Sequence, residues 1–294
     1  ATLAEVEALG GRALALPVDV ADAAAVDATA ERVERELGPI DVWVNDAMVT
    51  AYAPLSEITP EEYRRITEVV YLGQVHGTMA ALKRMRPRDR GTIVLVGSAL
   101  AYRGVPLQAA YCGAKFAIRG FADALRSELL HDGSRIRLSM VQLPAINTPQ
   151  FEWGRNEMPM YPQPVPPIFQ PELPARAILR AAYEAPRELW VGAPTLKLIL
   201  GQFLAPEYID RQLATMGYQG QQTDQRDPGG RPDNLFDPVP GDHGAHGRFD
   251  ARANGHGMIV DPTRLRQAVA AAGALLLGVS ALAAGARLLA RPRA

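Results

Sequence analysis

Short apolar runs alternate with longer amphipathic stretches over the first two thirds of the chain. Strands that are apolar on both faces, and separated by helices of ten or more residues, are typical of a parallel sheet covered by helices on both sides. The pattern therefore predicts an α/β fold with a doubly wound parallel sheet over residues 1–192. The predicted strands are Ala13–Val20, Ile40–Val44, Gly91–Val96, Ile136–Val141 and Glu188–Val191.

Amphipathic helices are predicted between these strands. Thr59 and Glu62 have the spacing of a capping box at the start of one of these helices. Ligands bind at the carboxyl ends of the strands in such sheets. We therefore expect the functional site just after Val44, Val96 and Val141. The predicted helices are Ala23–Leu37, Pro60–Met85, Ala109–His131 and Pro171–Ala185.

Three side chains with complementary acid–base chemistry lie after the strand that ends at Val96. Ser98 follows this strand, and Tyr111 and Lys115 are four residues apart on the next predicted helix. Residues at this spacing share one helix face, although an ordinary surface pair would have the same spacing. Reduction of a carbonyl needs a proton donor, and a neighbouring ammonium lowers the pKa of a phenol. We expect Tyr111 to act as acid and base, Lys115 to lower its pKa, and Ser98 to position the carbonyl oxygen.

The run from Ile93 to Lys115, IVLVGSALAYRGVPLQAAYCGAK, resembles the active-site block of the short-chain dehydrogenase/reductase family, in which a serine precedes Tyr-x-x-x-Lys. The resemblance extends over about Ala1 to Gly192. It implies a Rossmann-like fold, hydride transfer between NAD or NADP and a carbonyl or alcohol, and a homo-oligomer. It also implies that Lys115, beside Tyr111, orients the ribose of the cofactor.

Further marks of this family occur in the expected order along the chain. They resemble the Asp-Val pair that holds the adenine, the Asn-Asn-Ala-Gly turn, and the end of the Pro-Gly-x-x-x-Thr stretch that closes over the nicotinamide. The residues implied to bind the cofactor are Asp19, Val20, Asn45, Ala47, Tyr111, Lys115, Pro144, Ile146 and Thr148.

Two departures from the family pattern affect the prediction. The Gly-x-x-x-Gly-x-Gly turn that lets the backbone approach a pyrophosphate has no counterpart, because Gly10-Gly11 precedes a predicted strand. We therefore expect the chain to be N-terminally truncated, to lack the first βαβ segment with a gap in mid-sheet, and to bind cofactor poorly. Val70 takes the position of the family's helix asparagine, which supports a water beside the lysine.

Composition excludes several other classes of protein. The chain has 31 basic and 32 acidic residues and a net charge of −1, so it has no overall charge that would attract nucleic acid. Cys112 is the single cysteine, which excludes an internal disulfide and favours a cytoplasmic catalytic domain. His243 and His246 are too few for a fixed metal site, and no metal is expected.

The last third of the chain has a different composition. The stretch Gln150–Pro174 is rich in proline and aromatic residues and lies where the family that the chain resembles has its variable substrate lid, which implies a lid here and an apolar substrate. Residues 193–218 are predicted to be an apolar helical extension, and residues 219–262 a flexible linker. Within residues 263–294, the uncharged segment Gln267–Ala286 would form a helix about 30 Å long, the thickness of a bilayer core. This helix either anchors the protein in a membrane or packs on the domain.

The sequence therefore favours an oxidoreductase that uses NAD or NADP to act on a small carbonyl or alcohol. The residues that distinguish NAD from NADP follow the absent glycine turn, so this choice stays open. A non-catalytic nucleotide-binding or scaffold protein on the same fold is the alternative that Val70 and the absent turn favour. An isomerase or epimerase would need an added sugar-nucleotide domain, which the sequence does not indicate.

Overall fold

The computed structural model describes residues 2–272, and its centre is a five-stranded sheet. Its strands are, in spatial order, β1 (Val42–Asn45), β3 (Thr92–Val96), β4 (Arg137–Gln142), β8 (Glu188–Val191) and β11 (Ile259–Val260). The first four are parallel, and β11 pairs antiparallel with β8. The predicted Rossmann-like α/β fold with a central parallel sheet is confirmed.

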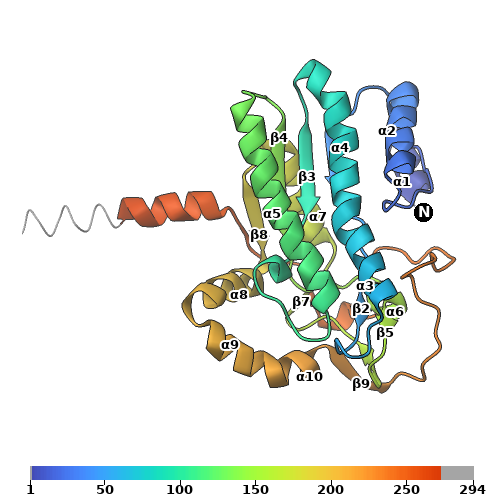
Figure 1. Ribbon diagram of the computed structural model, residues 1–294, viewed down its shortest axis with the longest axis vertical. Helices are drawn as coiled ribbons and strands as arrows, with labels where there is room; N and C mark the ends of the chain where they lie inside the picture. Colours follow the sequence, from blue (N-terminus) through green and yellow to red (C-terminus); the bar gives the residue numbers. More distant parts are fainter. Residues whose placement is uncertain (1, 273–294) are drawn as a thin grey trace, which may run out of the picture.

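Helices cover both faces of the sheet (Figure 1). On one face lie α3 (Pro60–Thr67), η1 (Glu68–Leu72), α4 (Gly73–Met85) and α5 (Ala109–His131), and on the other lies α7 (Glu172–Glu184). Alternate residues of β3 face the two layers, because Ile93 and Leu95 belong to the core cluster under α4 and α5, whereas Val94 belongs to that under α7. This two-sided burial explains why the strand is apolar throughout.

Most predicted elements occur with bounds close to those expected. α2 (Ala23–Leu37), α5 and β8 have the predicted bounds. The capping box forms as predicted, because the Glu62 N–H donates to Thr59 Oγ1 and the Thr59 N–H donates to Glu62 Oε2. The helix predicted over Pro60–Met85 contains the π-helical turn η1, a feature that often marks functional sites.

The strand predicted over Ala13–Val20 does not form, and this segment has no regular secondary structure. A strand is stable where its backbone groups pair with a neighbour. Within residues 2–272, β1 has a paired neighbour on one side only, β3, and its Val42 and Val44 are each 41% exposed. Residues 13–20 therefore lie outside the sheet.

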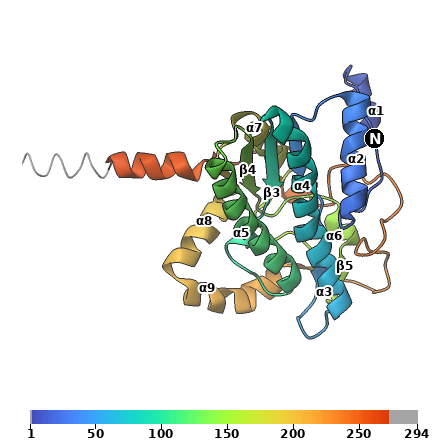
Figure 2. The ribbon, with the colours of Figure 1, turned by 45° about the horizontal axis from the view of Figure 1, so that its top comes forward.

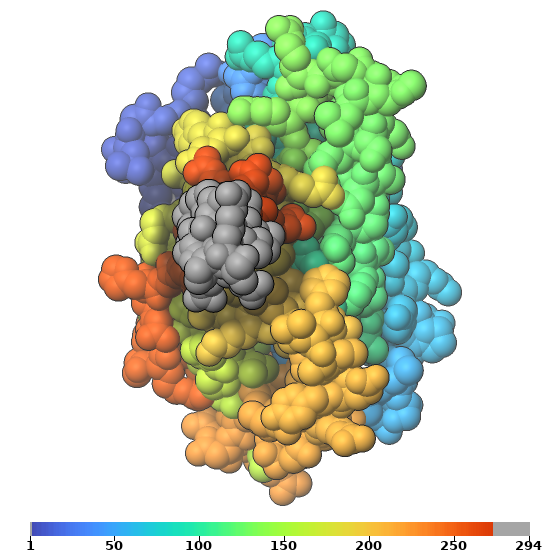
Figure 3. Space-filling view, turned by 90° about the vertical axis from the view of Figure 1, so that its left-hand side faces the viewer, coloured from blue at the N-terminus to red at the C-terminus, as the bar shows by residue number. Residues whose placement is uncertain are grey.

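The stretch expected to be a flexible linker instead packs against the domain, as the orange and red surface in Figure 3 illustrates. β9 (Gln222–Arg226) pairs with β6 (Met160–Pro162), and β10 (Ala253–Asn254) pairs with β7 (Ile168–Phe169). Leu235 is completely buried in the main core. The linker prediction was wrong because it rested on the average composition of the stretch, which is polar. A few apolar residues within the stretch nevertheless make specific contacts with the domain.

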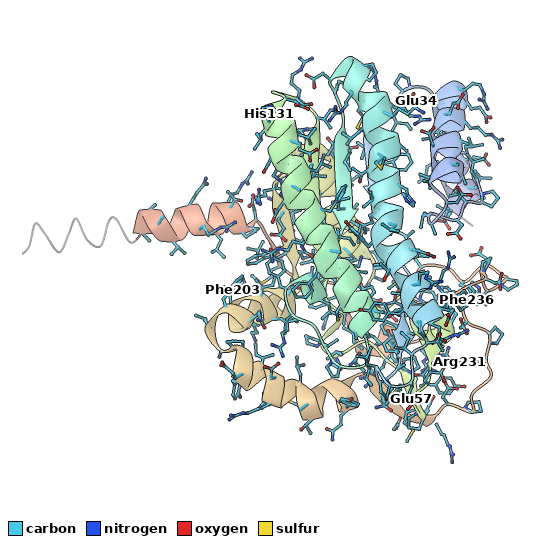
Figure 4. All side chains as sticks on the ribbon, in the orientation of Figure 1. Glu34, Glu57, His131, Phe203, Arg231 and Phe236 are labelled. Carbon is cyan, nitrogen blue, oxygen red and sulfur yellow. The ribbon has the colours of Figure 1, made fainter. Side chains whose placement is uncertain are left out.

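Side-chain contacts hold the same stretch beside α3, where Figure 4 labels Arg231 and Phe236. Arg65 of α3 donates to the Leu235 carbonyl oxygen at 3.0 Å, and Arg231 donates to the Gly154 carbonyl oxygen at 2.7 Å. The guanidinium of Arg155 lies 5.5 Å from the centre of the Phe236 ring.

The apolar extension forms α8 (Gly192–Leu204), α9 (Pro206–Gln212), η4 (Leu213–Gly217) and α10 (Tyr218–Gly220), beside the start of α5 (Figure 2). Arg103 joins this arm to the domain, because it donates to Gln202 and forms an ion pair with Asp210. The remaining short elements are α1 (Thr2–Ala8), β2 (Ala51–Tyr52), η2 (Arg86–Arg88), η3 (Ala99–Ala101), α6 (Gln150–Trp153), β5 (Arg155–Asn156) and η5 (Asp250–Arg252).

A last helix begins at Pro262 and continues to residue 272, where the described part of the chain ends. Within residues 2–272, no helix combines the length and the apolar character that crossing a membrane requires. Most of the predicted span, Gln267–Ala286, lies outside the described residues.

Candidate active site

Ser98 lies just past the carboxyl end of β3 and is 7% exposed. Its Oγ accepts a hydrogen bond from the Leu100 N–H at 3.1 Å and so caps η3. Its own N–H donates to Oε1 of Gln142 at 2.7 Å. Gln142 is completely buried at the end of β4, so the neighbouring strand fixes the backbone of Ser98.

Tyr111 and Lys115 lie one turn apart near the start of α5, as their spacing predicts. The side chains of Tyr111 and Ser98 are neighbours, because Ser98 acts on the pKa of Tyr111. Lys115 is 2% exposed, its Nζ donates to the Val96 carbonyl oxygen at 2.7 Å, and it lies 5.5 Å from the centre of the Tyr111 ring. The structure thus brings the three predicted catalytic side chains together at the end of β3.

The electrostatics of this group differ in part from the expectation. Burial raises the pKa of Tyr111 above its usual value, and the interaction with the Ser98 side chain offsets only part of this effect. Burial lowers the pKa of Lys115 to about 8, against the opposing attraction of Asp46. The ammonium is directed at the Val96 carbonyl oxygen, so burial governs the pKa of the phenol in this structure.

Asp46 is a charged neighbour of this group and is not among the site residues predicted from the sequence. Although much of the residue is exposed, the protein around its carboxyl raises the pKa of Asp46, and Lys115 counteracts this rise. Its position between Asn45 and Ala47, directly after β1, is the sequence feature that could have identified Asp46 as a site residue. The charge of Asp46 favours the protonated form of Lys115.

Three of the predicted cofactor residues, Val20, Asn45 and Ala47, lie around one hollow beside the open edge of β1. The hollow has a volume of about 110 Å³, below the roughly 300–1,000 Å³ typical of ligand pockets. It could therefore hold part of a nucleotide rather than a whole dinucleotide. Its lining residues are Val18, Val20, Val26, Thr29, Trp43, Val44, Asn45, Asp46, Ala47, Gly73, Gln74 and Gly77.

The side chain of Asn45 is engaged within the protein. Its Oδ1 accepts from the Trp43 indole N–H at 2.9 Å, and its Nδ2 donates to Thr78 Oγ1 at 3.2 Å. A Cβ on Gly77 would come within 2.1 Å of Asn45 Oδ1, so α4 can approach β1 here because residue 77 is glycine. Asn45 thus fixes the wall of the hollow.

Asp19 does not line the hollow. Burial alone would raise its pKa, but hydrogen bonds from the Ala21 N–H and from Arg65, at 2.8 Å, hold the pKa of Asp19 below its usual value. Its carboxylate is therefore held by groups of this chain.

Pro144, Ile146 and Thr148 lie past β4, away from the hollow. Ile146 is 8% exposed and forms an isolated bridge with Phe169. The Thr148 N–H donates to the Ile146 carbonyl oxygen at 3.0 Å, and Pro144 lies close to Gly192. Apart from Asp19, Tyr111 and Lys115, the predicted cofactor residues are thus in two groups, one around the hollow and one after β4.

Burial or hydrogen bonding within the protein accounts for three other residues noted in the sequence. Val70 is completely buried, and Cys112 is 6% exposed with a pKa that burial raises to about 11, as for a packed thiol. His246 bonds to Asp250 and Glu172. Within residues 2–272, no cluster of histidine, cysteine or acidic residues has the arrangement of a metal site.

Comparison with known proteins identifies the family. Residues 1–158 match the model of the short chain dehydrogenase family. YxnA, an uncharacterized oxidoreductase of Bacillus subtilis (strain 168), is 28% identical over 241 residues, which are 81% of this chain and 68% of YxnA. The human dehydrogenase/reductase SDR family member 7 is 38% identical over 116 residues, 40% of this chain and 34% of that protein.

The 3-dehydrosphinganine reductase of Danio rerio is 30% identical over 175 residues, which are 58% of this chain and 52% of that enzyme. The chain thus spans about two thirds of YxnA and about half or less of the other two relatives. The crystal structure of a short-chain dehydrogenase from Streptomyces avermitilis has a TM-score of 0.58 at 27% identity, covering 74% of this chain and 84% of that one. The chain therefore belongs to the short-chain dehydrogenase family of oxidoreductases.

Proposed function

We propose that the protein interconverts a carbonyl compound and its alcohol with NAD or NADP, and that Ser98, Tyr111 and Lys115 form the catalytic group. The observation that carries this proposal is the convergence of the three side chains: Ser98 acts on the pKa of Tyr111, and the Lys115 ammonium lies 5.5 Å from the centre of the phenol ring. All three lie at the carboxyl end of β3, where open α/β sheets bind their ligands.

Each residue has a distinct role in this proposal. Ser98 donates a hydrogen bond to the substrate oxygen, since its hydroxyl is held by the cap of η3 and its backbone by Gln142. Tyr111 delivers a proton to the oxygen, and its raised pKa keeps it protonated before reaction. Lys115 stabilises the phenolate that forms, because its positive charge favours an anion nearby.

The cofactor would be held by residues of two groups. Val20 and Ala47 line the hollow beside β1, with Asn45 fixing its wall, while Pro144, Ile146 and Thr148 follow β4. A nicotinamide group, when bound, supplies or accepts the hydride. The chain has no Gly-x-x-x-Gly-x-Gly turn for the pyrophosphate, so we expect the 294 residues by themselves to bind either cofactor weakly.

The substrate proposed is apolar outside its reacting carbonyl. Aromatic residues follow the cofactor-closing stretch, and Phe151 packs with Tyr52 and Phe249 close to the same end of the sheet. The name of the Danio rerio relative, a 3-dehydrosphinganine reductase, makes a long-chain ketone a reasonable member of the substrate panel.

The experiment is to follow NADH and NADPH oxidation over a panel of carbonyl compounds, with wild type and Tyr111→Phe. We expect turnover by wild type and its loss in Tyr111→Phe, with cofactor affinity retained. Tyr183→Phe, at a tyrosine that is 73% exposed, is the matched control and should behave as wild type.

Other outcomes would refute the proposal. Turnover that persists in Tyr111→Phe refutes the assignment of the acid. A wild-type protein that binds NADH or NADPH but turns over no carbonyl and no alcohol would support the non-catalytic alternative. Conversion of a substrate without net cofactor oxidation or reduction would support an isomerase.

A further inference from the structure

A second pocket lies between α5, the start of β8 and the last helix, which leaves the domain beside them (Figure 1). It has a volume of about 90 Å³, and its lining does not include the three proposed catalytic residues. Four arginines and two acidic residues line it, which gives an excess of two positive charges. We call it the arginine pocket, and its charged residues are Arg119, Asp123, Arg126, Arg187, Glu188 and Arg266.

Both carboxylates of the arginine pocket have partners within the protein. Asp123 Oδ1 accepts from Arg126 at 3.0 Å and from Arg187 at 2.7 Å. Glu188 accepts from two neutral donors, a tyrosine hydroxyl at 2.7 Å and a glutamine amide at 2.6 Å. Two of the four arginines therefore suffice for the ion pairs of these acids.

The other two arginines leave most of their hydrogen-bond donors unused. The guanidinium of Arg119 lies 3.9 Å from the centre of the Tyr102 ring, and within residues 2–272 it forms no hydrogen bond and no ion pair. Arg266 donates through Nε to the Pro262 carbonyl oxygen at 3.1 Å and forms no ion pair with any described residue. A guanidinium has five N–H donors, so both side chains can still donate to a ligand.

Arg126 has a buried donor that the described residues do not satisfy. Its side chain is 16% exposed, and within residues 2–272 its buried Nε has no hydrogen-bond partner. Burial, followed by the like charge of Arg187, lowers the pKa of Arg126. An anion beside Arg126 would accept from this N–H and would reduce the repulsion between the two guanidiniums.

We propose that the arginine pocket binds a phosphate group, which Arg119, Arg126 and Arg266 hold through their unused N–H donors. A phosphate group carries a charge of about −1.5 to −2 at neutral pH, which matches the excess charge of the pocket. Its oxygens accept from the planar forks of several guanidiniums. A carboxylate would neutralise only one of the two excess charges.

The size and the exposure of the pocket agree with a single phosphate group. Its volume of about 90 Å³ is below the roughly 300–1,000 Å³ of pockets for whole organic ligands, so the rest of the ligand would lie outside. The side chain of Arg187 is 49% exposed, and Arg266 is exposed as well, so ions have access from solvent. The proposal does not rest on the catalytic function, because phosphate binding is measured without turnover.

A purely structural role of the arginines is the alternative, since Arg119 packs on Tyr102 and Arg126 pairs with Asp123. The two roles predict different responses to phosphate. A ligand that binds only the folded protein raises its Tm, and replacing a residue that holds the ligand removes this rise. Replacing a residue that only stabilises the fold lowers the Tm equally with and without phosphate.

The test titrates the 294-residue chain with inorganic phosphate by isothermal titration calorimetry and measures the Tm with and without phosphate. We expect wild type to bind, and the affinity to fall roughly tenfold or more in Arg119→Gln and in Arg266→Gln. Because Arg266 is exposed, Arg266→Gln still tests the proposal if Arg119→Gln does not fold. Arg64→Gln, at an exposed arginine of α3 outside the pocket, is the matched control and should bind as wild type does.

Several outcomes would overturn the proposal. Wild type that does not bind millimolar phosphate, or an equal loss of affinity in Arg64→Gln, would refute the pocket as the site. Acetate, which carries a single charge, should bind more weakly, and equal affinities for acetate and phosphate would refute the assignment to phosphate.

Two further ligands identify the source of the phosphate group. Glycerol phosphate represents a soluble phosphate ester, and phosphatidylcholine vesicles that contain phosphatidic acid represent a lipid headgroup. Binding of glycerol phosphate without binding of the vesicles, lost in Arg119→Gln, identifies a soluble ligand. Binding of the vesicles that is lost in Arg119→Gln identifies the headgroup, and binding to either that Arg119→Gln and Arg266→Gln leave unchanged refutes the site.

Discussion

The backbone N–H of Ser98 donates a hydrogen bond of 2.7 Å to the side-chain oxygen of Gln142. The other end of this amide donates to Glu188 at 2.6 Å, and Glu188 accepts from the Tyr102 hydroxyl at 2.7 Å. All four residues are 9% exposed or less. A buried chain of hydrogen bonds from β4, β8 and the end of η3 thus fixes the position of Ser98.

Replacing Gln142 with leucine should break this chain at its centre. The Ser98 N–H and a carboxylate oxygen of Glu188 would be left buried without this partner, at an expected loss of roughly 2–4 kcal/mol in the free energy of unfolding. Urea denaturation measures this loss, and kcat should fall because Ser98 is no longer fixed. Ser139→Ala, at a completely buried serine whose Oγ donates to the Pro186 carbonyl oxygen at 2.7 Å, is the control for the loss of one hydrogen bond. A change of less than about 0.5 kcal/mol would contradict the importance of the network.

The protonation of Lys115 should limit carbonyl reduction at alkaline pH. Burial lowers its pKa to about 8, so the positive charge that favours the Tyr111 phenolate is lost as the pH rises through this value. We expect kcat/KM for reduction to decline above about pH 8. In Lys115→Arg, whose guanidinium stays charged, any residual activity should show no such decline. A wild-type profile that is flat well above pH 8 would contradict this assignment.

The sequence pattern predicted those elements whose formation depends on local signals. The two-sided burial of β3 and the capping box at Thr59 leave direct marks in the sequence, and both are observed. The strand predicted over Ala13–Val20 was wrong, because a strand also depends on a neighbouring strand to pair with, which the sequence of the segment does not encode. The composition of Ala13–Val20 therefore identified an apolar run but did not show that this run lies outside the sheet.

The candidate site could likewise be predicted from the sequence only where local signals determine it. Ser98, Tyr111 and Lys115 could be identified because strand end and helix spacing bring them together. Asp46 was not identified, because its importance depends on its interaction with Lys115, a residue distant in sequence. Hydrogen bonds between strands, such as that from Ser98 to Gln142, likewise require the register of β3 and β4.

Leu235 should be essential for stability although it lies in a stretch of polar composition. It is completely buried in the main core cluster, so Leu235→Ala removes packed apolar volume and should cost roughly 2–5 kcal/mol. Thermal and urea unfolding measure the effect. Leu204→Ala, at a leucine that is 82% exposed, is the matched control and should change stability by less than about 0.5 kcal/mol. Equal stability of both variants would mean that residues 219–262 are not packed as described.

A contact between His246 and two carboxylates should make the C-terminal segment sensitive to pH. The imidazole Nδ1 bonds to Asp250 at 2.8 Å, and Nε2 bonds to Glu172, at the start of α7, at 2.7 Å. These hydrogen bonds raise the pKa of His246 above its usual value and lower those of both carboxyls. Asp250 also accepts from Asn147 at 2.8 Å, so the contact joins this segment to the stretch after β4.

Because the pKa of His246 is higher in the folded state, its stabilising effect is complete below the unfolded value of about 6.5 and is lost as the pH rises through the folded value. Wild type should therefore have a higher Tm than His246→Gln near pH 6, and the difference should disappear at clearly alkaline pH. Thermal unfolding followed by circular dichroism over this range measures it. His256→Gln, at an exposed histidine with no such contact to any of residues 2–272, should match wild type throughout. A difference between wild type and His246→Gln that does not vary with pH would show that the contact acts through packing rather than charge.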